Sequence, residues 1–233
     1  MAKRPSAKDL ADFPLPPFAG FPADAFAFFA ELAEHQTKDW FEANRARYEQ
    51  GVRGPFQSLV ADVSTAAAEA GLPFRGDAKS ALFRIHRDVR FSKDKRPYKT
   101  NAGAVLRADK DAERGILYIH LSADDGFVAC GFYDPDKDLL ARLRQGMVEN
   151  PDRWRRVTAS LSHHGLAFDP SYSLTRPPRG YPTNLAPDIE EALKFNSLVV
   201  RRDLDRSAMQ SPALVAELIA FAKAASPVLT LLG

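Results

Sequence analysis

Apolar residues recur every three or four positions in the first part of the chain, which is typical of helices. Thr37 can cap one of these helices, Pro55 can open the next, and Gly71 is placed to end it. Gly51 and Gly54 lie between those two helices and predict an interruption there. The pattern predicts helices over residues 23–36, 38–50 and 55–70.

The hydrophobic period changes from 3.6 to 2 after residue 80. In "ALFRIHRD" the apolar Phe83 and Ile85 alternate with Arg84 and His86, as in a strand with one buried face. "NAGAVLRA" is a second strand candidate, and "GILYIHLSADDGFVACGFYDP" predicts two strands joined by an Asp-Asp-Gly turn. Because the connections between these strands are too short for helical crossovers, we expect an antiparallel sheet.

Helical periodicity returns in "DKDLLARLRQGMVENPDRWRRVTASLSHHG", where Pro151 can open a second helix and Gly165 can end it. Residues 166–187 are rich in Pro, Tyr and Arg, and we expect them to be irregular. A short helix in "PDIEEALKF", a strand in "SLVVRRDL" and a last helix from Ser211 follow. Helices, then strands, then helices predict an α+β fold, with an antiparallel sheet of about four to six strands packed with N-terminal and C-terminal helices.

The first 17 residues hold four prolines and no periodicity, so we expect a flexible leader over 1–17 and a single α+β domain over 18–233. A chain of 233 residues that is 45% apolar and 27% charged has the composition of an ordinary soluble globular protein. Its one cysteine, Cys130, cannot form an intramolecular disulfide, and its N-terminus has no apolar signal-peptide core. No apolar run approaches the roughly 18 residues of a membrane span. The sequence therefore predicts a cytoplasmic protein without a membrane partner.

Positive charge is concentrated between Lys79 and Lys99. The whole chain has 32 Lys and Arg against 30 Asp and Glu, a formal net charge of +2. Eight of these basic residues and only two acids, Asp88 and Asp94, lie in this segment, which leaves 24 basic and 28 acidic residues elsewhere. Two acids cannot neutralise eight cations, and unneutralised like charge costs stability unless a partner offsets it. The near-neutral total excludes bulk nucleic-acid packaging, so any anion site must be local.

The segment from Lys79 to Thr100 therefore predicts an anion-binding site. Arginine forks match phosphate or carboxylate geometry, and lysines add charge. Pro97 and the alternating charges predict a loop after the strand, where Tyr98 can add a neutral hydrogen bond. The candidate anion-binding residues are Arg84, Arg87, Arg90, Lys93, Lys95, Arg96, Tyr98 and Lys99. The alternative is that these side chains are solvated, or that they pair with Asp88, Asp94 and acids elsewhere in the chain.

Two histidines are candidates for acid–base chemistry. His86 and His120 both alternate with apolar neighbours on expected strands of one sheet, so they can line one cavity together with Arg84 and Tyr118. The alternative is that both are half-exposed sheet residues without a role. The five histidines and the single cysteine form no familiar metal-ligand spacing, and no P-loop or dinucleotide glycine fingerprint is present. We therefore expect neither a metal nor a cofactor.

Three stretches carry a resemblance to a known family: "WFEANRARYEQGVRGPF", "LFRIHRDVRFSKDKRPYKTNAGAVL" and "FNSLVVRRDL". In these stretches the sequence resembles the bacterial and fungal family called domain of unknown function 2461, from about Phe18 to near the end of the chain. The arginine-lysine block is the most specific of the shared motifs. The resemblance implies a single-domain, mostly cytoplasmic α+β protein with no assigned reaction, and it supplies no catalytic residues.

The leading hypothesis is that residues 79–100 bind a phosphorylated or otherwise anionic small molecule, with a histidine as proton donor where chemistry follows binding. A first alternative is a nucleic-acid-binding module in which the basic loop follows backbone phosphates and Tyr98 or Phe91 stacks on a base. A second alternative is a non-catalytic domain whose basic loop docks an acidic protein partner.

Overall fold

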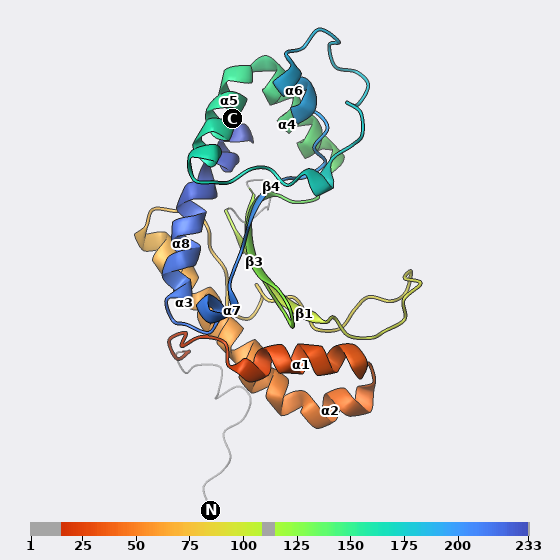
Figure 1. The fold of residues 1–233 in the computed structure, drawn as a ribbon, viewed down its shortest axis with the longest axis vertical. Helices are drawn as coiled ribbons and strands as arrows, with labels where there is room; N and C mark the ends of the chain where they lie inside the picture. The colour runs from red at the N-terminus through yellow and green to blue at the C-terminus, as the bar shows by residue number, and fades with distance from the viewer. Residues whose placement is uncertain (1–14, 109–114, 233) are drawn as a thin grey trace, which may run out of the picture.

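The fold is described from a computed structural model that covers residues 15–108 and 115–232 (Figure 1). The predicted leader, 1–17, falls mostly outside the described residues. Phe18, where we expect the folded part to begin, is buried, and its amide donates a hydrogen bond of 2.7 Å to the Asp62 carboxylate.

Helices flank a central sheet on both sides in the sequence, which confirms the predicted α+β class. The strands are β1 (Asn101–Arg107), β2 (Ile116–Ser122), β3 (Gly126–Phe132) and β4 (Leu198–Asp203). The α-helices are α1 (Ala23–Glu34), α2 (Lys38–Arg47), α3 (Gly54–Glu69), α4 (Lys137–Glu149), α5 (Pro151–His163), α6 (Pro187–Ala192), α7 (Arg206–Met209) and α8 (Leu214–Ala225). A π-helical turn, η2 (Tyr48–Arg53), and two 3-10 helices, η3 (Pro170–Tyr172) and η4 (Ser226–Leu232), complete the described elements.

The four described strands form an antiparallel sheet in the order β1-β2-β3-β4, as the short connections predict. Side chains alternate strictly along β2, where every second residue from Leu117 to Leu121 is buried. That buried face packs against α3 and α8, which contact β1 and β3 (Figure 1). The opposite face carries the polar residues of the alternation.

The C-terminal stretch Leu214–Leu232 is long and apolar enough to cross a membrane by length and composition alone, contrary to the expectation that no such run exists. In the fold, Leu214, Leu218 and Phe221 on this stretch are fully buried, and α8 contacts α3 and β3. Its apolar residues therefore serve the core of the α+β fold.

The predicted interruption at Gly51 and Gly54 is wrong, because the chain stays helical from α2 through η2 into α3. Pro55 lacks an N–H and cannot make the bond that a regular helix requires four residues back. The wider π turn directly before it absorbs this lost bond without ending the helix. Gly71 ends α3 as predicted, with a left-handed φ of 69°.

The strand expected around residues 82–87 does not form. Only isolated bridges occur there, between Leu82 and Ala104 and between His86 and Tyr98. Because pairing with β1 is not continuous, the alternation of faces fails: Ile85 is buried, but Phe83 is 48% exposed. Residues 86–98, named the arm from here on, instead run out and back as an irregular loop whose base is closed by a 2.8 Å bond from the Arg87 amide to the Pro97 carbonyl.

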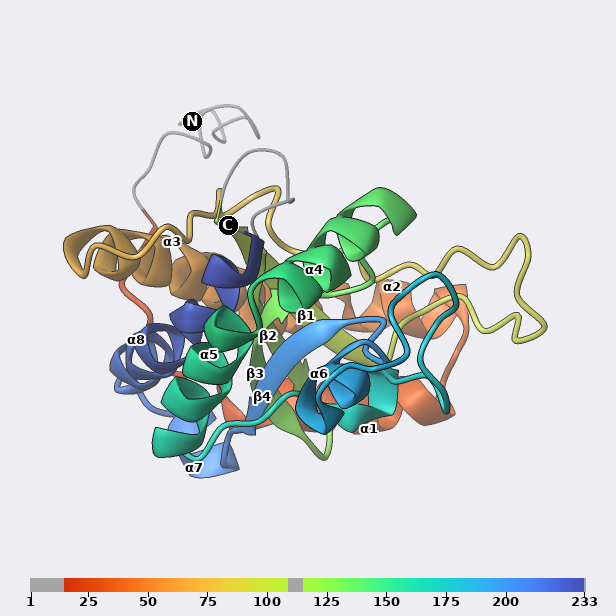
Figure 2. The ribbon, with the colours of Figure 1, turned by 90° about the horizontal axis from the view of Figure 1, so that it is seen from above.

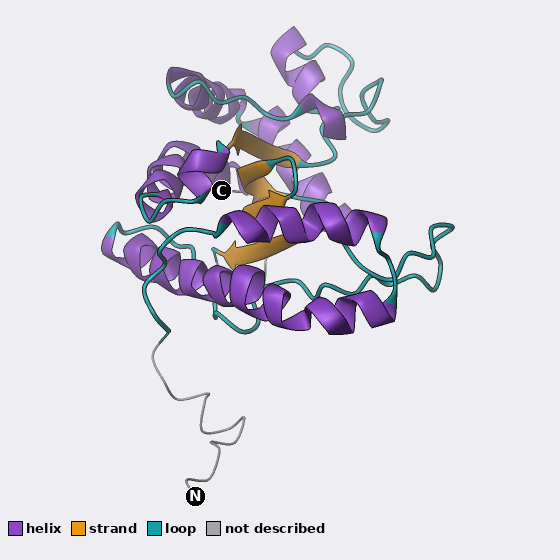
Figure 3. Cartoon of the chain, turned by 60° about the horizontal axis from the view of Figure 1, so that its bottom comes forward, coloured by secondary structure: helices purple, strands orange, loops and turns teal. Residues whose placement is uncertain are grey.

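Two groups of elements stand on either side of the open sheet face. Helices α1 and α2 lie together at one end with the arm beyond them (Figure 3), and α4, α5 and α6 lie at the other. The arm and the 173–186 loop extend on the same side of the sheet (Figure 2). The open face of the sheet is therefore the floor between two walls.

Candidate functional site

The open face of the sheet forms the floor of a cleft of about 620 Å³, named the sheet cleft here. Its volume falls within the roughly 300–1,000 Å³ typical of small-molecule sites. The strands supply the floor residues Asn101, Val105, Ile116, Tyr118, His120, Phe127, Ala129, Val199 and Arg201, and Cys130 of β3 adjoins them. One wall consists of Phe83, Arg87, Asp88 and Lys99, and the other consists of Tyr133, Asp169 and Tyr172.

Strand register explains why these side chains share one face. Directly opposed residues of an antiparallel pair point to the same side of the sheet. His120 opposes Gly103 on β1 and Phe127 on β3, and Tyr118 lies two residues before it on β2. Tyr118 and His120 therefore stand next to each other on the floor, with the predicted hairpin as their frame.

A hydrogen-bonded chain of polar side chains starts at Tyr118. Its hydroxyl lies 2.9 Å from His120 Nδ1, and His120 Nε2 lies 3.4 Å from the Asp125 carboxylate. Because a carboxylate only accepts, the Nε2 proton faces Asp125, and Nδ1 accepts the Tyr118 hydroxyl proton. The lone pairs of the phenol oxygen remain available to a molecule in the cleft.

Burial shapes the protonation of this pair. It lowers the pKa of His120, and the nearby Asp125 carboxylate only partly opposes that effect. Burial also raises the pKa of Tyr118 to about 12, with further contributions from Tyr133 and Asp125. At neutral pH the arrangement is a neutral phenol that donates to a neutral imidazole, which is a short path for moving one proton.

Gly103 makes room for Tyr118. A Cβ at position 103 would lie 2.6 Å from the Tyr118 hydroxyl oxygen and 2.7 Å from a ring carbon. No side chain larger than hydrogen fits there while Tyr118 holds its place beside His120.

On the β3–β4 side of the floor, the Phe127 ring contacts both the His120 imidazole and the Arg201 guanidinium. His120 stacks on Phe127 with ring centroids 4.5 Å apart, and the Arg201 guanidinium lies 3.7 Å from the centroid of Phe127. Arg201 also pairs with Asp203 at 2.8 Å. These contacts hold the imidazole flat and fix a positive charge beside the Asp125 carboxylate.

The basic segment contributes Lys99 and Arg87 to the cleft. Lys99 Nζ lies 5.0 Å from the centroid of Phe83 and has no acid partner among the residues that the structure describes. Partial burial and the positive charge of Arg84 lower the pKa of Lys99. Arg87 is shared, because it also pairs with Asp94 at 2.6 Å.

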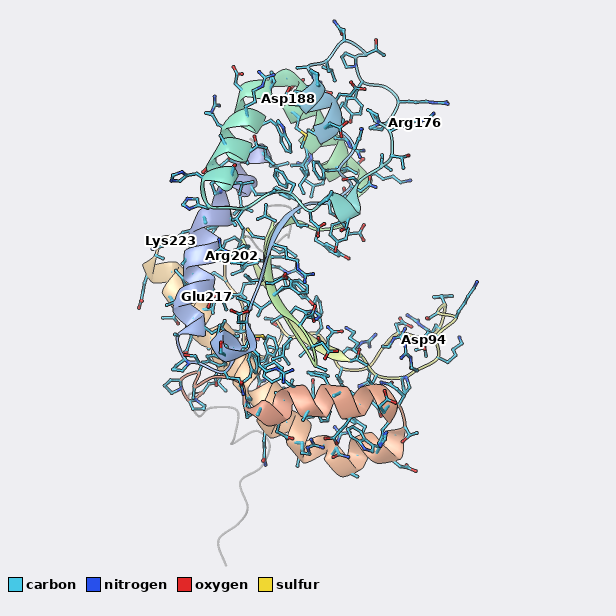
Figure 4. All side chains as sticks on the ribbon, in the orientation of Figure 1. Asp94, Arg176, Asp188, Arg202, Glu217 and Lys223 are labelled. Carbon is cyan, nitrogen blue, oxygen red and sulfur yellow. The ribbon has the colours of Figure 1, made fainter. Side chains whose placement is uncertain are left out.

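The acids of the basic segment are fully engaged within the arm. Asp94, on the outward part of the arm in Figure 4, pairs with Arg87 and with Arg96, and Asp88 pairs with Arg90 at 2.6 Å. Hydrogen bonds from Arg96 and Arg87 hold the pKa of Asp94 far below its usual range. Within the described part of the chain, the basic residues of the segment without an ion pair are Lys79, Arg84, Lys93, Lys95 and Lys99.

The structure brings only some of the candidate residues together. Arg87, Lys99 and His120 line the sheet cleft with Tyr118, whereas the lining does not include Arg84, Arg90, Lys93, Lys95, Arg96, Tyr98 or His86. The expectation that His86 and Arg84 share a cavity with His120 and Tyr118 is therefore wrong. The irregular backbone turns the His86 ring toward Phe41 of α2, 5.9 Å away, and Tyr98 is buried in a stack on the same ring at 4.5 Å.

Several residues that line the cleft were not among the sequence candidates: Phe83, Tyr133, Asp169, Tyr172 and Arg201. Neither was Asp125, which contacts His120. Alternation in "SLVVRRDL" carries a signal for Arg201, because it shares a strand face with Val199. Tyr133 directly follows β3. Tyr172 carries no such signal, since it lies in the single turn η3, which only the tertiary fold brings beside β4.

No group of three or more His, Cys, Asp or Glu side chains in residues 15–108 and 115–232 is placed to hold a metal ion. Cys130 is buried, and burial raises the pKa of its thiol to about 12, so it is an inert small hydrophobe.

Comparison with known proteins gives one match. A family model described as "Conserved hypothetical protein (DUF2461)" matches residues 24–230. No curated protein and no solved structure matches the chain.

Proposed function

The chain belongs to the DUF2461 family of conserved hypothetical proteins, and we propose that it binds a small phosphorylated ligand in the sheet cleft. One observation carries the proposal: Lys99, a cation without an acid partner in the described chain, lines the same cavity as the Tyr118–His120 pair. A cleft of this size suits a metabolite better than an extended polymer.

The state of Lys99 favours an anionic occupant. Its charge is disfavoured by partial burial and by Arg84, and a bound anion offsets both effects. Arg87 lies on the same wall and offers a second cation, although Asp94 already takes part of its donor capacity. A phosphate fits this pair of donors, because lysine acts as a point charge and arginine as a fork.

We assign proton transfer within the cleft to Tyr118 and His120. A ligand hydroxyl that approaches the Tyr118 oxygen can give up its proton to the phenol while the phenol passes its own proton to His120 Nδ1. The imidazolium that forms faces Asp125, which stabilises its charge. His120→Gln and Tyr118→Phe should retain ligand binding and lose turnover of any bound ligand that reacts.

Thermal unfolding in the presence of phosphorylated compounds tests the proposal. The panel consists of inorganic phosphate, pyrophosphate, sugar phosphates, nucleotides and short single-stranded oligonucleotides. We expect a small phosphorylated compound to raise Tm, and Lys99→Gln to abolish the rise. Lys93→Gln is the matched control, because it removes the same charge from an exposed arm position outside the cleft.

A second candidate function is single-stranded nucleic-acid binding by the arm. Phe91 is 94% exposed, and the Arg90 guanidinium lies 5.8 Å from its ring centroid, as in surfaces that stack bases and follow phosphates. In that case only the oligonucleotides of the panel raise Tm. Lys93→Gln reduces that rise more than Lys99→Gln does, and the affinity for oligonucleotides falls steeply as the salt concentration increases. If no compound of the panel raises Tm, both ligand binding in the sheet cleft and nucleic-acid binding by the arm are refuted. The remaining hypothesis is then that the arm docks an acidic protein partner.

A further inference from the structure

The sheet cleft collects aromatic side chains that the fold leaves uncovered. The exposed large hydrophobic residues of the described chain are Leu15, Phe83, Phe91, Tyr133, Tyr172 and Leu174. Three of them, Phe83, Tyr133 and Tyr172, line this one cavity. Single exposed hydrophobic residues are ordinary on a protein surface, but three around one cavity with a cationic wall point to a ligand that has a flat apolar part.

Tyr133 and Tyr172 form a corner. Their ring centroids lie 5.5 Å apart and their planes meet at 88°, so a flat ring that stacks on one of them inside the corner presents its edge to the face of the other. Burial raises the pKa of Tyr172, so its phenol stays protonated at neutral pH and can donate to a ring nitrogen or oxygen. Asp169 lines the same wall and offers a carboxylate to an amino group.

The corner and the cations stand at opposite edges of the sheet. Lys99 lies two residues before β1, and the Asp169 amide donates a 2.9 Å bond to the Val199 carbonyl on the free edge of β4. Three strand spacings, about 14 Å, separate β1 from β4, and Tyr133 follows the end of β3 that lies away from Asn101, so the two groups are also offset along the strands. A free phosphate is too short to meet both walls, so a ligand that meets both needs a phosphate at one end, a flat ring at the other and a spacer such as a sugar between them.

Polar side chains stand among the apolar residues of the floor between the two walls. Asn101, Tyr118 and His120 line it and present hydrogen-bonding atoms where the middle of such a ligand would lie. Sugar hydroxyls are suited to these partners, and one of them would face the phenol oxygen of Tyr118.

We propose that the ligand of the sheet cleft is a mononucleotide, with its base at the Tyr133–Tyr172 corner and its phosphate at Lys99 and Arg87. This inference rests on the proposed function, because it names the class of the small phosphorylated ligand. The base is placed by stacking, so its identity is set by contacts to Asp169 and to the Tyr172 phenol.

Isothermal titration with the four common nucleoside monophosphates, ribose 5-phosphate and inorganic phosphate tests the inference. We expect at least one nucleotide to bind about tenfold tighter than ribose 5-phosphate, the size of one stacking contact. Tyr172→Ala should remove this preference and leave the affinity for ribose 5-phosphate unchanged, while Tyr172→Phe should keep most of it. Phe91→Ala, which removes an exposed ring outside the cleft, is the control and should change nothing.

The outcomes separate the inference from the function on which it rests. Equal affinity of the wild type for ribose 5-phosphate and for every nucleotide refutes the mononucleotide and leaves phosphate binding in place. A nucleotide preference that survives Tyr172→Ala refutes the corner as the base site. Failure of every compound to bind refutes the proposed function itself. Circular dichroism of each variant confirms that the comparison is made between folded proteins.

Discussion

Replacing Gly103 tests the geometry of the cleft floor without knowledge of the ligand. Its φ lies outside the left-handed region, so alanine can adopt the backbone conformation of β1 at this position. Such a replacement stabilises a protein by about 0.4–1 kcal/mol when nothing else changes, because the unfolded chain loses freedom. Here the new Cβ would lie 2.6 Å from the Tyr118 hydroxyl oxygen, so the tyrosine must move.

The cost of that movement can be worked out from the contacts. Overpacking of this kind costs about 1–3 kcal/mol. Displacement of Tyr118 also breaks its bond to His120, which is worth about 1 kcal/mol. We therefore expect Gly103→Ala to lower the free energy of unfolding by about 1–3.5 kcal/mol, which lowers Tm by about 2–4 °C per kcal/mol in a chain of this size.

A double-mutant cycle with Tyr118→Ala isolates the contact. In the Tyr118→Ala background the clash is gone, so Gly103→Ala should be neutral or stabilising by about 0.4–1 kcal/mol. Urea unfolding of the wild type, the two single variants and the double variant at 25 °C gives the coupling energy, which we expect to be about 2–4 kcal/mol, the overpacking cost plus the lost hydrogen bond.

Two outcomes of the cycle test whether position 103 contacts the Tyr118 ring. In the Tyr118→Phe background most of the penalty should persist, because a ring carbon lies 2.7 Å from the new Cβ. If the Gly103 and Tyr118 substitutions are additive within about 0.5 kcal/mol, the two residues do not touch and the described floor is wrong.

The protonation of His120 and the pairing of the arm give three further predictions. Because burial lowers the pKa of His120 below 6.5 in the folded state, the unfolded state binds more protons just below pH 6.5. The free energy of unfolding, measured with urea, should therefore fall as pH drops through that window, and His120→Gln should reduce this dependence on pH. An unchanged dependence in the variant would contradict the reasoning. Asp125→Asn removes the carboxylate that favours the imidazolium, so an NMR titration should place the pKa of His120 still lower, and a rise would contradict the contact. Asp94→Asn releases Arg87 and Arg96, so amide hydrogen exchange in the arm should accelerate with little change in Tm; unchanged exchange would show that these pairs do not order the arm.

Local pattern was enough for much of the fold. The hairpin of β2 and β3 follows from strict alternation around an Asp-Asp-Gly turn, because the face that a strand residue occupies depends only on its place in the alternation. Tyr118 and His120 were predicted as neighbours on one face for the same reason. Proline and glycine positions likewise predicted where α3 ends and α5 begins, since both residues act through their own backbone.

The arm shows where local pattern fails. Alternation of Phe83 and Ile85 with polar residues predicted a strand, but a strand also needs a continuous partner, and the chain there bridges β1 only at isolated points. Charge density predicted an anion site in the segment, yet it could not select Lys99 and Arg87 from eight basic residues. Only the direction of the loop decides which of them line the cavity.

The sequence by itself determined the class of the fold, the sheet with its polar face, and the segment that concentrates positive charge, because periodicity and composition are properties of neighbouring residues. The tertiary structure alone decided that Lys99 and Tyr172, 73 positions apart in the chain, line one cavity. That convergence depends on strand order and on the segment that pairs along the edge of β4. Both are long-range contacts, and no periodicity within either segment encodes them.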